Sequence, residues 1–369
     1  MKRSLRAISL VGLCAVISVS LAISLPRDFI GDIAVFVSAG RLASLGLNPY
    51  GISAITPYSD TGTAFINLSP PLSVLFFQPI AWIDPPLLLR ISYGLSLLVY
   101  IAILFVFHRA YPRQISLLKD VWALAIFPLW LTLGFGQVYV LLLVAATVAW
   151  LALRSGHDDL AGLALGFLIA WKPNYLLWPL FLFLTGRRRA GLVSAATAGL
   201  LSNLPVLVYG PMIYVEWIKA SIQTSASIGG LGIVSFIAQD LGVAWVTVPV
   251  SICIILSAVI WVWRVKPEWQ RTSEVALVIA LLVLPITNMG YLLLLVPVFF
   301  SRPWTKPIVA AAVILMPDWG LLLNHATVGG EFGAFWPYPF AFALLLAYPI
   351  ISGKVRIRDA RLAIVIPSG

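Results

Sequence analysis

The chain has 369 residues, of which 61% are hydrophobic and only 10% are charged, and its mean hydropathy is +0.99. A soluble globular protein is about 45–50% apolar and about 25% charged, so this chain has too few charges to cover a surface in water. The composition predicts a polytopic integral membrane protein. It argues against nucleic-acid binding, because the net charge of +10 comes largely from short basic clusters between apolar runs, where cations orient membrane helices.

Apolar runs suited to membrane helices occur along the whole chain, since a bilayer core of about 30 Å needs about 20 apolar residues per helix. The clear runs are Ala7–Leu25, Pro86–Phe107, Val121–Phe135, Val138–Leu153, Leu160–Leu184, Ala190–Tyr209, Trp245–Trp263, Ile308–Leu323 and Ala334–Ile351. The weaker runs are Leu68–Ile83, Val275–Pro285 and Tyr291–Phe300. Together they predict an all-α polytopic membrane protein with about 12 transmembrane helices, plus or minus two.

The first run, Ala7–Leu25, follows three basic residues and has the layout of a secretory signal peptide. No A-x-A cleavage site follows it, and many more spans do. We therefore expect it to be retained as a transmembrane helix.

Clusters of lysine and arginine predict the orientation, because cytoplasmic loops carry an excess of these residues. The clusters are Lys2/Arg3/Arg6, Arg187–Arg189, Arg264/Lys266/Arg271, Arg302/Lys306 and Lys354/Arg356/Arg358/Arg361. Placing all five inside puts both termini in the cytoplasm. By parity, the break at Gly134–Gln137 then faces the cytoplasm, and Arg109, Arg113 and Lys119 lie outside. If Leu68–Ile83 does not cross, the loop 108–119 moves inside.

The spans form a single integral membrane domain over residues 1–369. The less apolar segments between them predict a first outer loop at 26–67, a second outer loop at 210–244 and a cytoplasmic tail at 353–369. Aromatic residues gather at the edges of the outer segments, as in an interfacial belt. With no soluble domain expected, chemistry is predicted at the outer face of the membrane.

The first outer loop contains a short predicted helix with an acidic residue at its start. From Asp32 to Leu45 apolar residues recur at helical spacing, and Gly46 is a typical C-terminal stop. We expect this helix to lie along the membrane interface. Asp32 is either a carboxylate favoured by the helix dipole or a general base held at the water–lipid boundary.

Lys172 lies in the middle of the apolar run Leu160–Leu184. A lysine at the centre of a membrane helix costs about 2.5–3.5 kcal/mol on insertion scales, so it needs a partner or a polar cavity. Pro173 would loosen the helix at this point and free backbone groups. We expect Lys172 to contact an anion rather than to extend to the interface as a structural lysine.

Motifs for several other kinds of chemistry are absent from the sequence. It has no Gly-rich phosphate loop, no Gly-x-Ser-x-Gly elbow and no metalloprotease histidine pair. The three histidines are far apart, and Cys14 and Cys253 both fall inside apolar runs, so neither a metal site nor a disulfide is indicated. We expect no bound cofactor. An internal repeat of the kind that transporters carry is also not visible.

Several sequence blocks together resemble one family of membrane enzymes. The blocks are Asp32-x-x-Val35-Phe36-x-x-Ala39, Gly46-x-Asn48-Pro49-Tyr50, Ser69-Pro70-Pro71-Leu72, Gly136-Gln137, Ala161-Gly162-x-x-Leu165-Gly166 and Trp171-Lys172-Pro173. This pattern resembles the polyprenyl-phosphate-mannose-dependent mannosyltransferases of glycosyltransferase family 87, in the GT-C class. The chain departs from the family where a Ser-Pro-His and a second histidine are usual, because Ile286 and Asn288 stand there.

The resemblance implies a GT-C-like fold and an enzyme that moves a hexose, with mannose favoured, from a polyprenyl phosphate to a glycan or glycolipid. Its partners would be this donor, the acceptor and membrane lipids, at the outer face of the cell's inner (plasma) membrane. The family's aspartate maps onto Asp32, the expected general base of an inverting transfer. Lys172, then Arg41 or Arg90, are expected at the donor phosphate. Candidate pocket residues are Asn48, Tyr50, Gln137, Asn174 and Asn288.

Three alternatives remain open from the sequence. A flippase for lipid-linked sugars would share the composition and the buried lysine, but it would not need an acidic interfacial helix, and repeat symmetry would be expected. A GT-C enzyme that uses another polyprenyl-linked sugar would keep the mechanism and change the pocket. A scaffold subunit that keeps the fold without activity would agree with the missing histidine.

Overall fold

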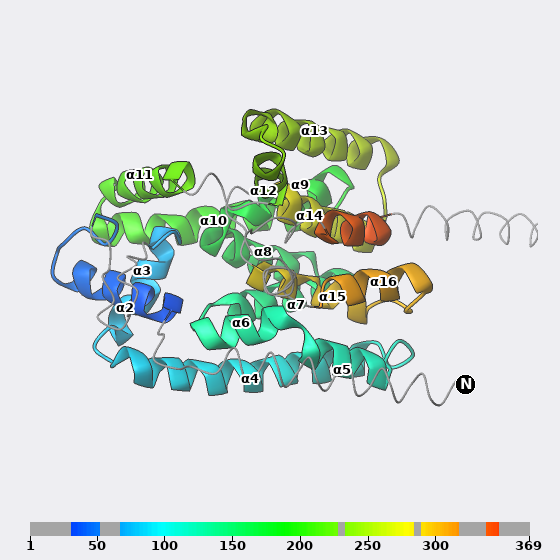
Figure 1. Ribbon diagram of the computed structural model, residues 1–369, viewed down its shortest axis with the longest axis horizontal. Coiled ribbons are helices and arrows are strands. Elements are labelled where there is room, and N and C mark those ends of the chain that lie inside the picture. The colour runs from blue at the N-terminus through cyan, green and yellow to red at the C-terminus, as the bar shows by residue number, and fades with distance from the viewer. Residues whose placement is uncertain (1–30, 52–66, 228–232, 284–288, 317–336, 347–369) are drawn as a thin grey trace, which may run out of the picture.

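The computed structural model describes residues 31–51, 67–227, 233–283, 289–316 and 337–346, and the regular structure within these ranges is helical (Figure 1). The first half contains α2 (Gly31–Ser44), α3 (Pro71–Phe77), η1 (Gln78–Ile80), α4 (Pro85–Ala110), α5 (Leu117–Ala125), α6 (Phe127–Phe135), α7 (Tyr139–Ser155), α8 (Asp158–Trp171), η2 (Pro173–Leu176) and α9 (Leu177–Leu184). The second half contains α10 (Arg188–Tyr209), α11 (Met212–Ser227), α12 (Ile233–Asp240), η3 (Ala244–Val246), α13 (Thr247–Val265), α14 (Trp269–Val283), η4 (Met289–Leu295), α15 (Val296–Phe300), α16 (Lys306–Ile314) and the helix Pro337–Leu346.

Three helical stretches of the described ranges are long and apolar enough to cross a membrane: α4, α10 and the stretch Ala244–Val265, in which η3 leads into α13. α5 and α6 meet at a bend of 40° and give a fourth if the pair is counted as one span. The other apolar helices are shorter. The all-α class is thus confirmed where the structure describes the chain, whereas the total of about 12 crossings stays a prediction. The predicted first span and the tail 353–369 lie outside the described residues.

One end of the helix bundle is rich in cations that join the ends of separate helices. Arg154, at the end of α7, donates to the carbonyl of Ala110 at the end of α4. Arg187, before α10, pairs with Asp158 of α8 at 2.6 Å. Lys119 Nζ donates to the carbonyl of Arg302 at 2.5 Å. We call this the basic end, and the opposite end, where Asp32 lies, the site end.

The loop 108–119 belongs to the basic end, which corrects the arrangement expected from parity. The weak run Leu68–Ile83 does not cross the bundle: Trp217 Nε1 donates to the Leu68 carbonyl at 3.1 Å, and the Tyr209 hydroxyl donates to Gln78. Both contacts are with the α10–α11 corner, so α3 and η1 stay at one end. The break at Gly134–Gln137 therefore lies at the site end. Hydropathy records the length of a run and not whether it crosses, so one run that turns back reverses the side assigned to the segments after it until a second run also turns back.

The predicted span Leu160–Leu184 is in fact a hairpin with Lys172 at its tip. α8 starts at Asp158, beside Arg187, and ends at Trp171. η2 and α9 then run back to Leu184, which precedes Arg187 by three residues. Lys172 is the C-cap of α8 with extended backbone, φ −141° and ψ 90°. The lysine is therefore at the end of a helix, not in the middle of one.

The segment 210–244, expected as an outer loop, is mostly helical. α11 packs on α10 and α3, and α12 packs on α13 and α14. Asn48 Nδ2 donates to Glu216 Oε2 of α11 at 3.1 Å, which ties this segment to the chain after α2. α11 therefore forms part of the site end, whereas α12 lies beside α13 (Figure 1).

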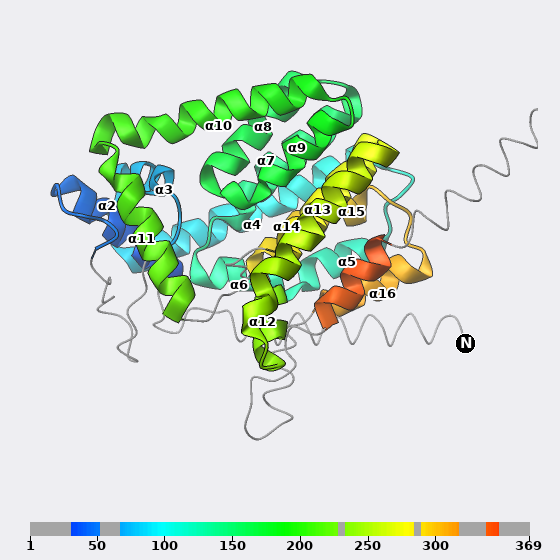
Figure 2. The ribbon, with the colours of Figure 1, turned by 90° about the horizontal axis from the view of Figure 1, so that it is seen from above.

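α8 packs closely on α10 because two glycines one turn apart face it (Figure 2). A Cβ on Gly162 would lie 2.8 Å from the Ala190 carbonyl oxygen, and a Cβ on Gly166 would lie 2.7 Å from that of Ser194. Small residues four apart allow two membrane helices to approach at their backbones. This contact fixes the rising limb of the Lys172 hairpin against α10.

We expect Gly166→Ala to destabilise the protein by about 1–3 kcal/mol, because overpacking of a close contact costs that much. The added Cβ would lie 2.4 Å from the Thr197 Cβ. Gly94→Ala on α4 is the matched control, since nothing lies within 4 Å of a Cβ there. The midpoint of thermal unfolding in detergent measures both variants, and equal midpoints would contradict the close packing.

Candidate functional site

Asp32 lies in the first turn of α2, whose first half is buried in the protein. Ile33 and Val37 are in the hydrophobic core, and Phe36 stacks on Phe77 of α3 with ring centroids 4.7 Å apart. The helix ends as expected, because Gly46 has a φ of +69°. The predicted helix is confirmed, and its first half packs on α3, α4 and α6. Its position along the membrane interface stays a prediction.

Gln137 reaches Asp32 from the sharp turn between α6 and α7. Gly136 ends α6 in the left-handed region with φ +64°, and a Cβ there would lie 2.7 Å from the Cβ of Ile33. A side chain at this position would thus separate α2 from the turn. Gln137 Nε2 donates to Asp32 Oδ2. Gln137 is 5% exposed, and its Oε1 has no hydrogen-bond partner within the described part of the chain.

Lys172 joins the site from the tip of its hairpin. Its Nζ donates to the Ser69 hydroxyl at 3.2 Å. The Ser69 carbonyl accepts from the Tyr50 hydroxyl at 2.9 Å, and its backbone N–H donates to Asn67 Oδ1 at 2.9 Å. Lys172 is therefore placed against the segment that leads into α3. Its ammonium has no carboxylate partner among the residues that the structure describes.

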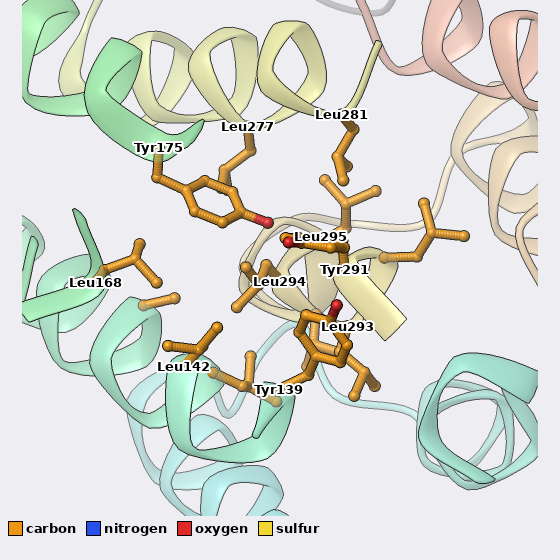
Figure 3. Packing of buried hydrophobic residues seen from close by; sticks show 14 of the residues in the cluster. Tyr139, Leu142, Leu168, Tyr175, Leu277, Leu281, Tyr291, Leu293, Leu294 and Leu295 are labelled. Carbon is orange, nitrogen blue, oxygen red and sulfur yellow. The ribbon is translucent and has the colours of Figure 1, made fainter. Parts of the chain in front are cut away.

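Two tyrosine rings lie beside the same lysine, and a third tyrosine packs on one of them. The Lys172 ammonium lies 5.5 Å from the Tyr291 ring centroid and 6.0 Å from that of Tyr139. The Tyr139 and Tyr291 rings are 4.6 Å apart, and the Tyr175 ring is 6.1 Å from Tyr291. Figure 3 shows Tyr139 and Tyr175 directed toward Tyr291 from opposite sides, with leucines filling the space around them. The faces of these rings stabilise the cation, and their bodies exclude water.

Gly290 is the point where this cluster meets Gln137. A Cβ on Gly290 would lie 2.3 Å from the Tyr139 ring and 2.9 Å from Gln137 Oε1. The backbone at the start of η4 therefore passes directly over the two side chains. Only glycine permits this approach.

Burial raises the pKa of Asp32 above its ordinary value of 3.8, because the charged form loses water. The hydrogen bond from Gln137 and the positive charge of Lys172 lower this pKa in part. Asp32 is thus a desolvated carboxylate with one amide donor and one nearby cation. Such a group is suited to accept a proton.

The other predicted site residues lie further away and have structural contacts. Arg41 is nine residues along α2 from Asp32, about 13 Å by helical rise, and its guanidinium donates to the carbonyls of Ala81 and Ile83. Arg90 is exposed on α4. Asn48 accepts from the Tyr50 backbone N–H at 2.9 Å and so forms a turn. The structure gives none of Arg41, Arg90 and Asn48 a place beside the Asp32 carboxylate.

Asn174 lies in η2, two residues after Lys172, and is partly buried. Asn288 lies outside the described residues. Sequence reasoning did not select Ser69 or the tyrosines as site residues. Tyr139 follows Gln137 by two residues, and Tyr175 follows Lys172 by three. Their closeness to these two polar residues was the sequence signal that could have identified them.

No group of three or more His, Cys, Asp or Glu side chains gathers within the described ranges in the way a metal site requires. The polar groups at the site are one carboxylate, one amide, one ammonium and hydroxyls. This set can move a proton and neutralise an anion.

The family model of glycosyltransferase family 87 matches residues 67–285, more than half of the 369-residue chain. Gln137, Lys172 and Ser69 lie inside the matched segment, and Asp32 precedes it. Neither the curated proteins nor the solved structures include a match to the chain.

We expect Gln137→Leu to raise the pKa of Asp32 further, because the lost hydrogen bond stabilises the charged carboxylate. Infrared difference titration, with the Asp32→Asn protein subtracted, measures this pKa. Gln114→Leu at the basic end is the control. An unchanged or lower pKa would show that Gln137 does not stabilise the carboxylate.

Proposed function

Because the chain belongs to glycosyltransferase family 87, we propose that it transfers a hexose, with mannose favoured, from a polyprenyl phosphate to a hydroxyl of a glycan or glycolipid. We place the reaction at the outer face of the inner (plasma) membrane, with the basic end and both termini in the cytoplasm. Positive loops on the cytoplasmic side support this orientation.

The observation that carries the proposal is that a buried carboxylate and a lysine lie together at one end of an apolar bundle. The lysine has no carboxylate in salt-bridge contact among the described residues. Asp32 and Lys172 come from helices far apart in sequence, and the charge of Lys172 acts on the carboxylate. The two groups have opposite uses. A carboxylate accepts the proton of an attacking hydroxyl, and an ammonium neutralises the charge on a departing phosphate.

In the proposed step, the acceptor oxygen attacks the anomeric carbon while Asp32 takes its proton. The bond from the anomeric carbon to the phosphate oxygen breaks, and the phosphate leaves with the bonding electrons as polyprenyl monophosphate. Direct displacement inverts the configuration at that carbon. No oxidant, nucleotide or further reactant is needed, because the donor carries its own leaving group.

Gln137 supports this step by holding the base in one orientation. Its Nε2 occupies Asp32 Oδ2, so the other carboxylate oxygen is left for the acceptor hydroxyl. The unpaired Gln137 Oε1 is a second acceptor, suited to a neighbouring sugar hydroxyl. The membership in a glycosyltransferase family favours this reaction over the flippase alternative.

We expect Asp32→Asn to lower the rate of sugar transfer by a factor of about 10²–10⁴, because this is the usual contribution of a general base. The asparagine keeps the hydrogen bond to Gln137 by amide reorientation but accepts no proton. The assay supplies purified protein with a panel of radiolabelled polyprenyl-phosphate sugars and identifies the labelled product, which also reveals the sugar.

Asp84→Asn is the matched control for this variant, because Asp84 is exposed before α4 and makes no capping bond. It should retain full turnover. Undiminished transfer by Asp32→Asn, at comparable protein levels, would refute the base assignment.

We expect Lys172→Met to weaken donor binding and slow departure of the phosphate. Loss of a charged hydrogen bond costs about 1.5–3 kcal/mol, so the specificity constant for the donor should fall by a factor of about ten to a hundred or more. Lys219→Met, at an exposed lysine paired with Glu216, is the control. Steady-state kinetics with varied donor concentration separate the two effects. An unchanged constant would make Lys172 a structural residue.

A further inference from the structure

A long apolar groove lies between α13 and α14, and none of the residues described around Asp32 lines it. Its volume is about 690 Å³. α13 and the turn before it contribute a single stripe at spacings of three and four: Val246, Pro249, Val250, Cys253, Ile254, Ser257, Ala258 and Trp261. Val275 and Ile279 of α14 line the opposite wall. From Trp245 to Trp261 the stripe is about 24 Å long by helical rise.

The groove is open along α13. Cys253 and Ser257 are exposed, and Val250 is 40% exposed, although all three point along the stripe that faces α14. No described side chain fills the space between the two helices. An extended apolar chain has the shape to fill it.

One end of the groove is cationic. Arg271, at the start of α14, lines it, and its guanidinium lies 5.9 Å from the Trp261 ring centroid. Arg264 is exposed three residues after Trp261, so it continues the same face of α13. Lys266 follows at the helix C-cap. Two guanidinium groups therefore flank the groove where it reaches the basic end.

The surroundings of Arg271 carry an excess of positive charge. Glu274 is fully buried and accepts from Arg271 at 2.7 Å and from Arg302 at 2.6 Å. Lys119 is also buried at this end, and its Nζ donates to the carbonyls of Phe300 and Arg302. Within the described residues, the carboxylates of Glu274 and Asp120 face the three cations Arg271, Arg302 and Lys119, so positive charge is in excess. The two terminal nitrogens of Arg271 also donate to the carbonyls of Leu345 and Leu346, and its buried Nε has no acceptor among the described residues.

We propose that this groove binds an anionic phospholipid, with its phosphate between Arg264 and Arg271 and one acyl chain along the α13 stripe. The apolar stripe holds the chain, and the charge excess selects a negative headgroup over a zwitterionic one. The sugar donor is a poorer occupant, because its phosphate is proposed at Lys172 in the site end. The site is independent of the transfer reaction, and binding is measured without activity.

Cys253 provides a direct test, since it lies on the groove and Cys14 is the other cysteine of the chain. Full-length Cys14→Ser protein in detergent is alkylated with N-ethylmaleimide in the presence of increasing phosphatidylglycerol or phosphatidylcholine. We expect phosphatidylglycerol to slow alkylation of Cys253 at lower concentration than phosphatidylcholine. The matched control carries Cys14→Ser, Cys253→Ser and Ile252→Cys, which moves the thiol to an exposed neighbour off the groove. Its alkylation should not discriminate between the two lipids.

Arg264→Gln tests the headgroup contact without disturbing the buried ion pairs. Its half-protecting phosphatidylglycerol concentration should rise about fivefold, because one arginine near a lipid surface is worth about 1 kcal/mol. Arg188→Gln, an exposed arginine at the basic end away from the groove, should leave it unchanged. Equal protection by the two lipids, equal lipid preference at positions 252 and 253, or an unaltered value in Arg264→Gln would each overturn the proposal.

Discussion

The hydrogen bond from Gln137 to Asp32 determines how the site is assembled. It joins α2 to the turn between α6 and α7, two segments separated by more than a hundred residues. The bond forms only because Gly136 lets the backbone of the turn come against Ile33. Through it, a carboxylate that precedes the family-matched segment is placed among groups that lie within it. The remaining features of the site depend on this placement.

The polar groups of the site end lie at places where a helix begins or stops. Gln137 follows the left-handed end of α6, Lys172 caps α8, and Gly290 lies at the start of η4. Irregular backbone at membrane depth is tolerated only where protein or a water-filled cavity surrounds it. Here the three helix breaks pack against one another, so the polar side chains beside them lie in one place. The polar side chains of the site are thereby held by the helices of the bundle itself.

The features predicted correctly from the sequence are helices and their ends, which follow from hydropathy and from helix-end residues. The helix at 31–44 with its stop at Gly46, and the long helices α4, α10 and α13, lie within a few residues of prediction. These features depend on local chemistry. Lys172 was selected from its position inside an apolar run and Asp32 from its place at the start of a short helix. Motif resemblance supported both and added Gln137, and the structure brings all three together.

The incorrect predictions concern the direction in which the chain runs between the two ends of the bundle, which local chemistry does not determine. The run Leu160–Leu184 has the length of a span, yet it folds back at Lys172, and Leu68–Ile83 never leaves the site end. A hairpin and a single helix have the same mean hydropathy. Pro173 was the one residue in this run whose type indicated that the helix ends there. The contact of Lys119 with Arg302, which reassigns the loop 108–119, joins residues more than 180 positions apart and has no local signature.

The hairpin also has a consequence for the surrounding bilayer. α8 has 14 residues and α4 has 26, so the two helices are about 21 Å and about 39 Å long. α8 begins and α4 ends at the basic end, and a hydrocarbon core is about 30 Å thick. The tip with Lys172 therefore stops short of the far headgroups, and lipid beside it must thin to meet the mismatch. At such a depression, a hydroxyl arriving from water and a phosphate carried by lipid can reach the same depth.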